Sequence, residues 1–443
     1  MARTNDLTSG SISRHLVLLS VPLILGNILQ QFYNTIDAFV VGHYTGDEAM
    51  AAIGIAGTIM NLFLFLIIGS CAGFSVLFAR FYGAREYDKF RRQHFLAFGI
   101  GLAGAYLLGS VGFLLMKPIL VIIQTPVQLM AGTSAYLVWI FASLPAAFLY
   151  NLYAALLRSV GDTKAALVIL GIAVFCNLAL DLLFVAKFQM GTQGAAMATA
   201  LTQLIAAAVC FGYVKRRYSM LFFRRKDWGI DWGILKKTLH FGIVTALHQS
   251  GLYLGKMLVQ GAVNSVGTDT IVAYTAATRI EGFVNSFGDS GAAATSVVTA
   301  QNYGAGKQER VRKTFFASLF LLIVLGVVCS AILFLTSDFT MGIMLGESRG
   351  AAFAEATGYL QIVSLFYLLC FTGNTFAGYF EGIGRVSIPF AGAIGHITLR
   401  VILAWIFVAK YQLDAVAVAT GIGWVLVNIF WTIMAVRKGS LKR

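Results

Sequence analysis

Two carboxylates lie deep inside apolar stretches of the first half of the chain. The first, Asp37, ends a polar run in which Gln30, Tyr33, Asn34 and Asp37 follow the spacing i, i+3, i+4 and i+7. A helix places residues with this spacing on one face. A charged group is costly in an apolar medium, so a carboxylate found there is a candidate functional group.

The second carboxylate, Asp181, follows Asn177 at the spacing i, i+4, which again gives one helix face. A pair of buried carboxylates can hold a proton, or both can ionise and bind a cation. Carboxylate and amide oxygens also suit a hard cation such as Na⁺. The alternative is that these polar faces only hold neighbouring helices together.

A further group of charged residues lies inside the apolar stretches of the second half. It comprises Lys256, Arg279, Glu281, Asp289 and Arg400. One interpretation is mutual ion pairing that fixes a helix bundle. The other is a role in substrate selection or in communication between the two halves.

No motif in the sequence indicates an enzyme, a cofactor or a metal site. The stretch Gly304–Lys307 has a glycine-rich look but lacks the full spacing of a phosphate loop. His248 and His396 stand alone, without metal-ligand spacing, and the 5 cysteines all sit in apolar runs. We therefore expect neither catalysis nor a bound cofactor.

The composition predicts a polytopic membrane protein. Hydrophobic residues make up 58% of the chain and charged residues 12%, whereas soluble proteins carry about 25% charged residues. A bilayer core requires about 20 apolar helical residues per crossing. Twelve spans satisfy this, at residues 15–42, 50–79, 94–116, 129–157, 165–186, 193–214, 239–265, 271–300, 314–336, 351–380, 387–409 and 415–436.

The basic residues assign a topology to these spans. The termini and even-numbered connections carry 26 of the 33 Lys and Arg residues, the opposite side carries 4, and 3 lie inside spans. This distribution follows the positive-inside rule with both termini cytoplasmic. The net charge of +14 is thus explained by topology, so we expect no nucleic-acid partner. We expect the chain in the plasma membrane (inner membrane) of a bacterium.

The chain contains an internal repeat. Residues 79–84 (ARFYGA) match residues 300–305 (AQNYGA) at an offset of 221, and 151–161 match 374–384 at an offset of 223. Each half holds six spans, an even number, so the halves share one orientation, as in parallel transporter repeats. The predicted fold is therefore an all-α membrane protein with two six-helix bundles, at residues 1–214 and 239–443, joined by a basic cytoplasmic linker at 215–238.

The two carboxylates of the first half have no acidic counterparts at the repeat-related positions of the second half. At the offsets above, Asp37 aligns with Leu258 and Asp181 aligns with Ala404. The scaffold can therefore be built without these carboxylates, which favours a functional role for them.

These features together resemble the multidrug and toxic compound extrusion family over nearly the whole chain. The resemblance rests on the twelve spans, the stretch 37–42 (DAFVVG), the Gly-Asp-Thr turn at 161–163, Asn177-x-x-x-Asp181 and the duplicated Tyr-Gly-Ala turns. It implies a monomeric antiporter that expels organic cations in exchange for H⁺ or Na⁺. It also implies a coupling site in the first bundle, made of Gln30, Tyr33, Asp37, Asn177, Asp181 and Thr199, with Asn151 a weaker match.

The same resemblance assigns Pro22 to the point at which the first span bends. Proline lacks an N–H group and its ring clashes with the carbonyl four residues earlier, so the helix is weakened there. A Na⁺ ion, if it is the coupling ion, would bind at Asp37, Asn177, Asp181 and Thr199. The sequence does not distinguish H⁺ from Na⁺.

Two other functions remain open at this point. A flippase for a lipid-linked precursor, found in other branches of the same superfamily, would require a cationic cavity, and Lys256, Arg279 and Arg400 are consistent with one. A channel or receptor without coupled exchange is the other alternative. Transport measurements under imposed ion gradients distinguish all three.

Overall fold

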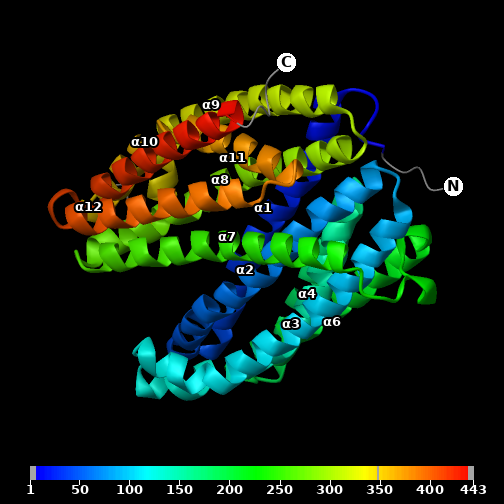
Figure 1. The fold of residues 1–443 in the computed structure, drawn as a ribbon. Helices are drawn as coiled ribbons and strands as arrows, with labels where there is room; N and C mark the ends of the chain where they lie inside the picture. The colour runs from blue at the N-terminus through cyan, green and yellow to red at the C-terminus, as the bar shows by residue number, and fades with distance from the viewer. Residues whose placement is uncertain (1–5, 347–348, 438–443) are drawn as a thin grey trace. The chain divides into compact units, whose positions relative to one another are not determined.

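The structure is a computed structural model that describes residues 6–346 and 349–437, without the side chains of residues 34–39. Helices dominate it, and no strand occurs in the part described (Figure 1). The helices are α1 (Ile12–Thr45), α2 (Asp47–Gly83), α3 (Tyr87–Ile122), α4 (Val127–Ser159), α5 (Thr163–Asp181), η1 (Leu182–Lys187), α6 (Gly191–Arg217), η2 (Ser219–Leu221), η3 (Arg225–Asp227), α7 (Trp232–Asn264), α8 (Thr268–Gly304), α9 (Gln308–Leu345), α10 (Ala351–Ser364), α11 (Tyr367–Gly382) and α12 (Ser387–Arg437).

The helices accommodate the twelve predicted spans. Among the described residues, 8 helices are long and apolar enough to cross a membrane, or 9 when the bent pair α10 and α11 is taken as one span. The 51-residue α12 contains a break at Gln412, whose φ is 48°, and so holds the last two spans. The 9 spans become ten when α12 is counted as two. Helices α7 and α8, which carry more charged residues, are the remaining two of the twelve predicted spans. The predicted all-α membrane fold is confirmed.

The tenth span differs from its prediction, because residues 351–380 do not form one straight helix. Instead α10 and α11 meet at an angle of 52°. At the junction, the N–H groups of Leu365 and Phe366 donate to carbonyls three residues earlier rather than four. This tighter turn changes the helix direction. The sequence has no proline or glycine at the junction that would have predicted the bend.

The repeat is visible in the backbone of the turns. After α2, Arg85 has a φ of 59°, and after α8 its repeat partner Gly306 has a φ of 71°. Gly161 and Gly384, which end the fourth and tenth spans, have φ values of 81° and 80°. In each pair the three residues around this position donate to the same relative carbonyls. The two halves therefore share the geometry of these turns.

The chain forms two compact units that do not coincide with a single cut of the sequence. Unit 1 comprises Met1–Asp6 and Leu25–Ala246, and unit 2 comprises Leu7–Ile24 and Leu247–Arg443. Helix α1 thus begins in unit 2 and ends in unit 1, and α7 does the reverse. This division differs from the sequence-based boundaries at 214 and 239, because hydropathy locates spans but does not say which neighbours they pack against.

In unit 1, two glycines of α2 allow a close approach of the first half of α7. A β-carbon at Gly73 would lie 2.4 Å from the carbonyl oxygen of Phe241, and one at Gly69 would lie 2.6 Å from Ala246 Cα. The hydroxyl of Thr245 donates to the carbonyl of Gly69 at 2.7 Å. Small residues are the usual means of close helix packing in membranes, where burial of apolar surface gives no advantage over lipid.

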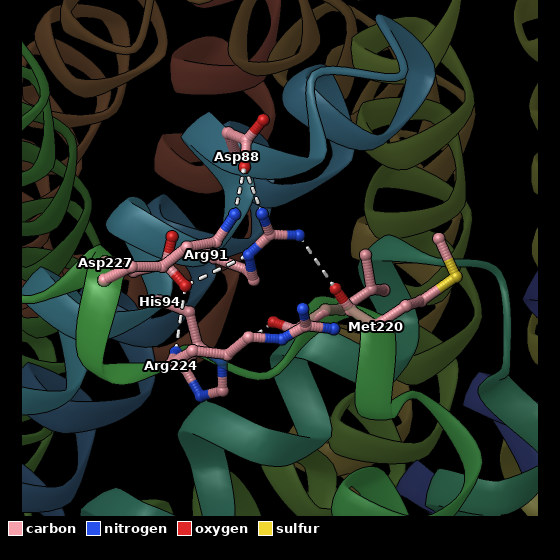
Figure 2. Close-up of polar contacts among 8 residues, drawn as sticks. Asp88, Arg91, His94, Met220, Arg224 and Asp227 are labelled. Atoms are coloured by element: carbon pink, nitrogen blue, oxygen red, sulfur yellow. Dashed lines mark hydrogen bonds and ion pairs between the residues drawn. The ribbon is translucent and has the colours of Figure 1, made fainter.

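The segment predicted as a basic linker is part of unit 1 and packs against α3. Between the ends of α6 and α7, the Asp227 carboxylate accepts a hydrogen bond from Arg91 Nε at 3.1 Å and one from the backbone N–H of Arg224 at 2.9 Å. Arg91 also donates to the carbonyl of Met220 at 3.2 Å and contacts Asp88 (Figure 2). The predicted linker is therefore a docked structural element whose single buried acid is held by α3.

Aromatic side chains of the same segment strengthen this docking. The ring of Phe223 lies 4.9 Å from that of His94, and Trp228 stacks on Phe95 with ring centroids 6.2 Å apart. His94 is fully buried and lies 3.3 Å from the carbonyl of Leu221. The segment thus combines an apolar contact with the Arg91–Asp227 pair.

Candidate functional site

Helix α5 presents Asn177 and Asp181 to the interior of unit 1. Its buried residues form one stripe at helical spacing: Thr163, Ala166, Ile169, Ala173, Asn177 and Asp181. The stripe is polar at its first residue, Thr163, and apolar from there to Asn177. Asn177 and Asp181 are each only 1% exposed. A buried carboxylate beside a buried amide at this depth is the polar feature that the i, i+4 spacing predicted.

The amide of Asn177 is not satisfied by the described part of the chain. Neither its oxygen nor its nitrogen has a hydrogen-bond partner there, although both atoms are buried. Leaving such groups unpaired costs about 1–3 kcal/mol each. A ligand, ion or water that binds at Asn177 would recover this energy.

Directly after Asp181 the helix changes type. Residues Leu182–Lys187 form a π-helix, η1, in which the hydrogen bonds span five residues. Such turns are rare and are frequently found at functional sites. The repeat-related residues 405–410 of α12 remain α-helical. This irregularity therefore belongs to the first half only, and no sequence signal had indicated it.

Helix α6 packs against α5 and carries Thr199, which is half-buried. Sequence reasoning missed two further residues on this helix. The hydroxyl of Thr202 and the amide oxygen of Gln203 are buried and have no hydrogen-bond partner among the described residues. Their spacing of i+3 and i+4 from Thr199 could have identified them as part of the same polar face.

The predicted residues of α1 are only partly described. Gln30 and Tyr33 are half-buried, whereas the side chains of Asn34 and Asp37 lie outside the described residues. The backbone nevertheless fixes a register in unit 1. A β-carbon at Gly26 would lie 3.5 Å from Leu170 Cδ2 of α5, so α1 and α5 pack against each other there.

Two further residues predicted from the sequence, Asn151 and Pro22, lie on α4 and α1. The Asn151 amide donates to the carbonyl of Ala147 on its own helix at 2.8 Å, which accounts for one of its polar atoms. Pro22 is buried inside the continuous α1, just before the point where this helix passes from unit 2 into unit 1.

Comparison with known proteins identifies the family of this chain. A family model described as MatE matches residues 22–183 and again residues 245–406, which are the two halves of the repeat. The chain belongs to the MatE family. This is a family of membrane transporters, the one that the sequence resemblance had indicated.

Individual MatE relatives match over almost the whole chain. The probable multidrug resistance protein YpnP of Bacillus subtilis (strain 168) is 28% identical over 405 residues, which cover 90% of this chain and 88% of YpnP. A structure of a multidrug resistance MATE family transporter in an outward-facing conformation superimposes with a TM-score of 0.90 at 21% identity, covering 100% of this chain and 99% of that one. A crystal structure of MATE in the bent conformation gives a TM-score of 0.89 at 21% identity, covering 99% of each chain.

In the second half of this MatE protein, the charged residues do not form the ion pairs that one interpretation expected. No ion pair within 4.0 Å joins Lys256, Arg279, Glu281, Asp289 or Arg400 to any described residue. Glu281 instead accepts hydrogen bonds from the hydroxyls of Tyr359 at 3.2 Å and Tyr367 at 3.4 Å. The direct partners of the Glu281 carboxylate among the described residues are therefore phenol hydroxyls.

One histidine that seemed isolated in the sequence has an acidic neighbour. His248 Nδ1 lies 3.8 Å from Glu381 Oε1, at the end of α11. His396 Nε2 is buried without a hydrogen-bond partner among the described residues. Within the described chain, no group of three or more His, Cys, Asp or Glu residues could hold a metal ion.

Proposed function

We propose that this MatE protein is a secondary active antiporter that exports cationic, amphipathic drugs or toxins in exchange for H⁺ or Na⁺. The observation that carries the proposal is the pairing of a buried carboxylate, Asp181, with the unsatisfied amide of Asn177. Intramembrane ionisable residues commonly mark ion and substrate pathways. The multidrug resistance role named for its relative YpnP agrees with this substrate class.

The register of α1 and α5 supports a second carboxylate at the same level. Gly26 of α1 lies against Leu170 of α5, a difference of 144 in residue number. Odd-numbered spans run in the same direction, and we infer that a similar register holds further along both helices, which would bring residue 37 level with Asp181 and residue 33 level with Asn177. Asp37 and Tyr33 would then belong to the site around Asp181.

Such a site couples an ion to a drug by competition for negative charge. Ionised carboxylates attract a cationic drug, and an aromatic wall such as Tyr33 adds cation–π attraction. Protonation of Asp37 or Asp181 from outside removes the charge and releases the drug. Na⁺ can act in the same way through the oxygens of Asp37, Asn177, Asp181 and Thr199, because hard cations prefer oxygen ligands.

Pro22 would allow α1 to change shape during the cycle. It lies in α1 just before the residues of this helix that belong to unit 1. A missing N–H group weakens the helix at this point, and a protein of this fold has been observed in a bent conformation. Straight and bent forms that differ by a few kcal/mol could be selected by protonation of the site.

We also propose a cellular location, an oligomeric state and a membrane topology for the protein. We place the protein in the bacterial plasma membrane as a monomer, with both termini in the cytoplasm, where the basic loops obey the positive-inside rule. Its partners are small organic cations and the lipid bilayer.

The experiment that tests the function is ethidium transport by the purified protein in liposomes under imposed H⁺ and Na⁺ gradients. An antiporter drives ethidium against its gradient when either ion flows the other way. Flux that only follows the ethidium gradient identifies a channel. Absence of ethidium flux together with movement of an anionic lipid between leaflets identifies the flippase alternative.

A further inference from the structure

The guanidinium of Arg400 lacks an acidic partner in unit 2. Its Nη2 lies 3.4 Å from the hydroxyl of Tyr274, and its buried Nε has no hydrogen-bond partner among the described residues. No described carboxylate lies within ion-pair distance of it. An arginine at membrane depth is expensive, and such residues usually pair or mark a pathway.

The charged residues around Arg400, counted with it, are equal in number of each sign, but none of the described carboxylates lies within ion-pair distance of its guanidinium. The thiol of Cys370 lies within electrostatic range of Glu281, Asp289, Lys256 and Arg400, so these four belong to one cluster. Two tyrosines occupy the Glu281 carboxylate, and Lys256 lies within range of Asp289. Glu281 also attracts Arg400 at a distance, but among the described residues the one hydrogen bond of the guanidinium is to the phenol of Tyr274.

The internal repeat relates Arg400 to a residue of the candidate site in unit 1. At the offset of 223, Arg400 occupies the position of Asn177, and Ala404 occupies that of Asp181. The position that offers oxygen ligands in unit 1 therefore offers a cation in unit 2. The planar guanidinium binds carboxylates and phosphates through two parallel hydrogen bonds, for which the compact ammonium of lysine is a poorer match.

We propose that Arg400, assisted by the hydroxyl of Tyr274, binds the anionic group of transported amphiphiles, a carboxylate or a phosphate monoester. The inference rests on the proposed function, because such a site serves a chain that moves organic solutes. It names the side chains that would recognise the anionic group of such compounds. The competing explanation is that Arg400 stabilises unit 2 by acting on Glu281 at a distance.

The test uses two ligands that differ only in the anionic group. A fluoroquinolone and its methyl ester share every other feature, and their affinities for the purified protein are measured without any ion gradient. In Arg400→Gln we expect the affinity for the acid to fall at least tenfold and that for the ester to change less than twofold. Lys410→Gln, which removes an exposed charge from the same helix, should affect neither.

Further arms separate the alternatives. Decyl phosphate identifies a phosphate source if its binding depends on Arg400, and Arg400→Lys should retain part of the preference for anions if the glutamine variant does not fold. Equal losses for acid and ester, or no loss for any anionic probe, overturn the proposal. Selective binding of the acid without ethidium export would instead contradict the antiporter proposal and leave the Arg400 site in place.

Discussion

Replacement of Arg91 by methionine should release the docked segment between α6 and α7. Arg91 is 9% exposed and Asp227 is 4% exposed, so their contact is shielded from water. Removing one partner of a buried pair leaves the other charge uncompensated and costs about 3–5 kcal/mol. At roughly 2 °C per kcal/mol, the midpoint of unfolding should fall by at least about 6 °C.

The rate of limited trypsin digestion is a second measurement of undocking in the same variant. The segment carries exposed cleavage sites at Arg224, Arg225 and Lys226, next to the residues that dock it. If cleavage requires undocking, a loss of about 3 kcal/mol raises the cleavage rate roughly 100-fold, because the rate follows the population of the open form.

The neighbouring arginine supplies a matched control. Arg92 is 51% exposed and lies 3.7 Å from Asp231, so Arg92→Met should cost only about 0–1 kcal/mol. Digestion of Arg91→Met at the wild-type rate, or equal effects in the two variants, would show that the buried Arg91–Asp227 pair does not hold the segment in place.

Three further predictions concern packing, the repeat and α1. Gly73→Ala should destabilise unit 1 by about 1–3 kcal/mol in thermal unfolding, because its new β-carbon meets the backbone of α7, whereas Gly99→Ala has open space and should not destabilise it. Ala404→Asp should not restore drug resistance to Asp181→Asn in a growth assay, because Arg400 replaces Asn177 in the second half; rescue would show that the halves are interchangeable. Pro22→Ala should slow ethidium transport while retaining ethidium binding. Spin-label distances along α1 should no longer respond to pH in this variant. Normal transport together with a normal pH response would mean that Pro22 is only a fixed structural element.

The sequence predicted the parts of the fold that depend on hydropathy and local spacing. Apolar runs gave the spans, and the repeated Tyr-Gly-Ala turns predicted backbone turns that the structure shares between halves. The i, i+4 spacing of Asn177 and Asp181 correctly predicted one polar face, which the structure shows to be buried. Each of these properties is encoded by residues close in sequence.

Features that depend on distant contacts could not be predicted in the same way. The bend between α10 and α11, the π-helix after Asp181 and the docking of Asp227 on Arg91 all arise from tertiary packing. A basic composition made residues 215–238 resemble a solvated linker, although Asp227 and several aromatic residues within it are anchors. Among the described residues, the lack of ion pairs at Lys256, Arg279, Glu281, Asp289 and Arg400 was equally hidden, because the presence of both charge signs in the sequence says nothing about the distance between them.

We propose that the buried carboxylate of unit 1 couples ion movement to drug export. The most direct measurement is ethidium export by proteoliposomes under an imposed H⁺ or Na⁺ gradient, compared between the wild-type protein and Asp181→Asn of matched thermal stability. We predict gradient-driven export by the wild-type protein with one of these ions and none by the variant. Export by Asp181→Asn at the wild-type rate, with the same dependence on the gradient, would contradict this account.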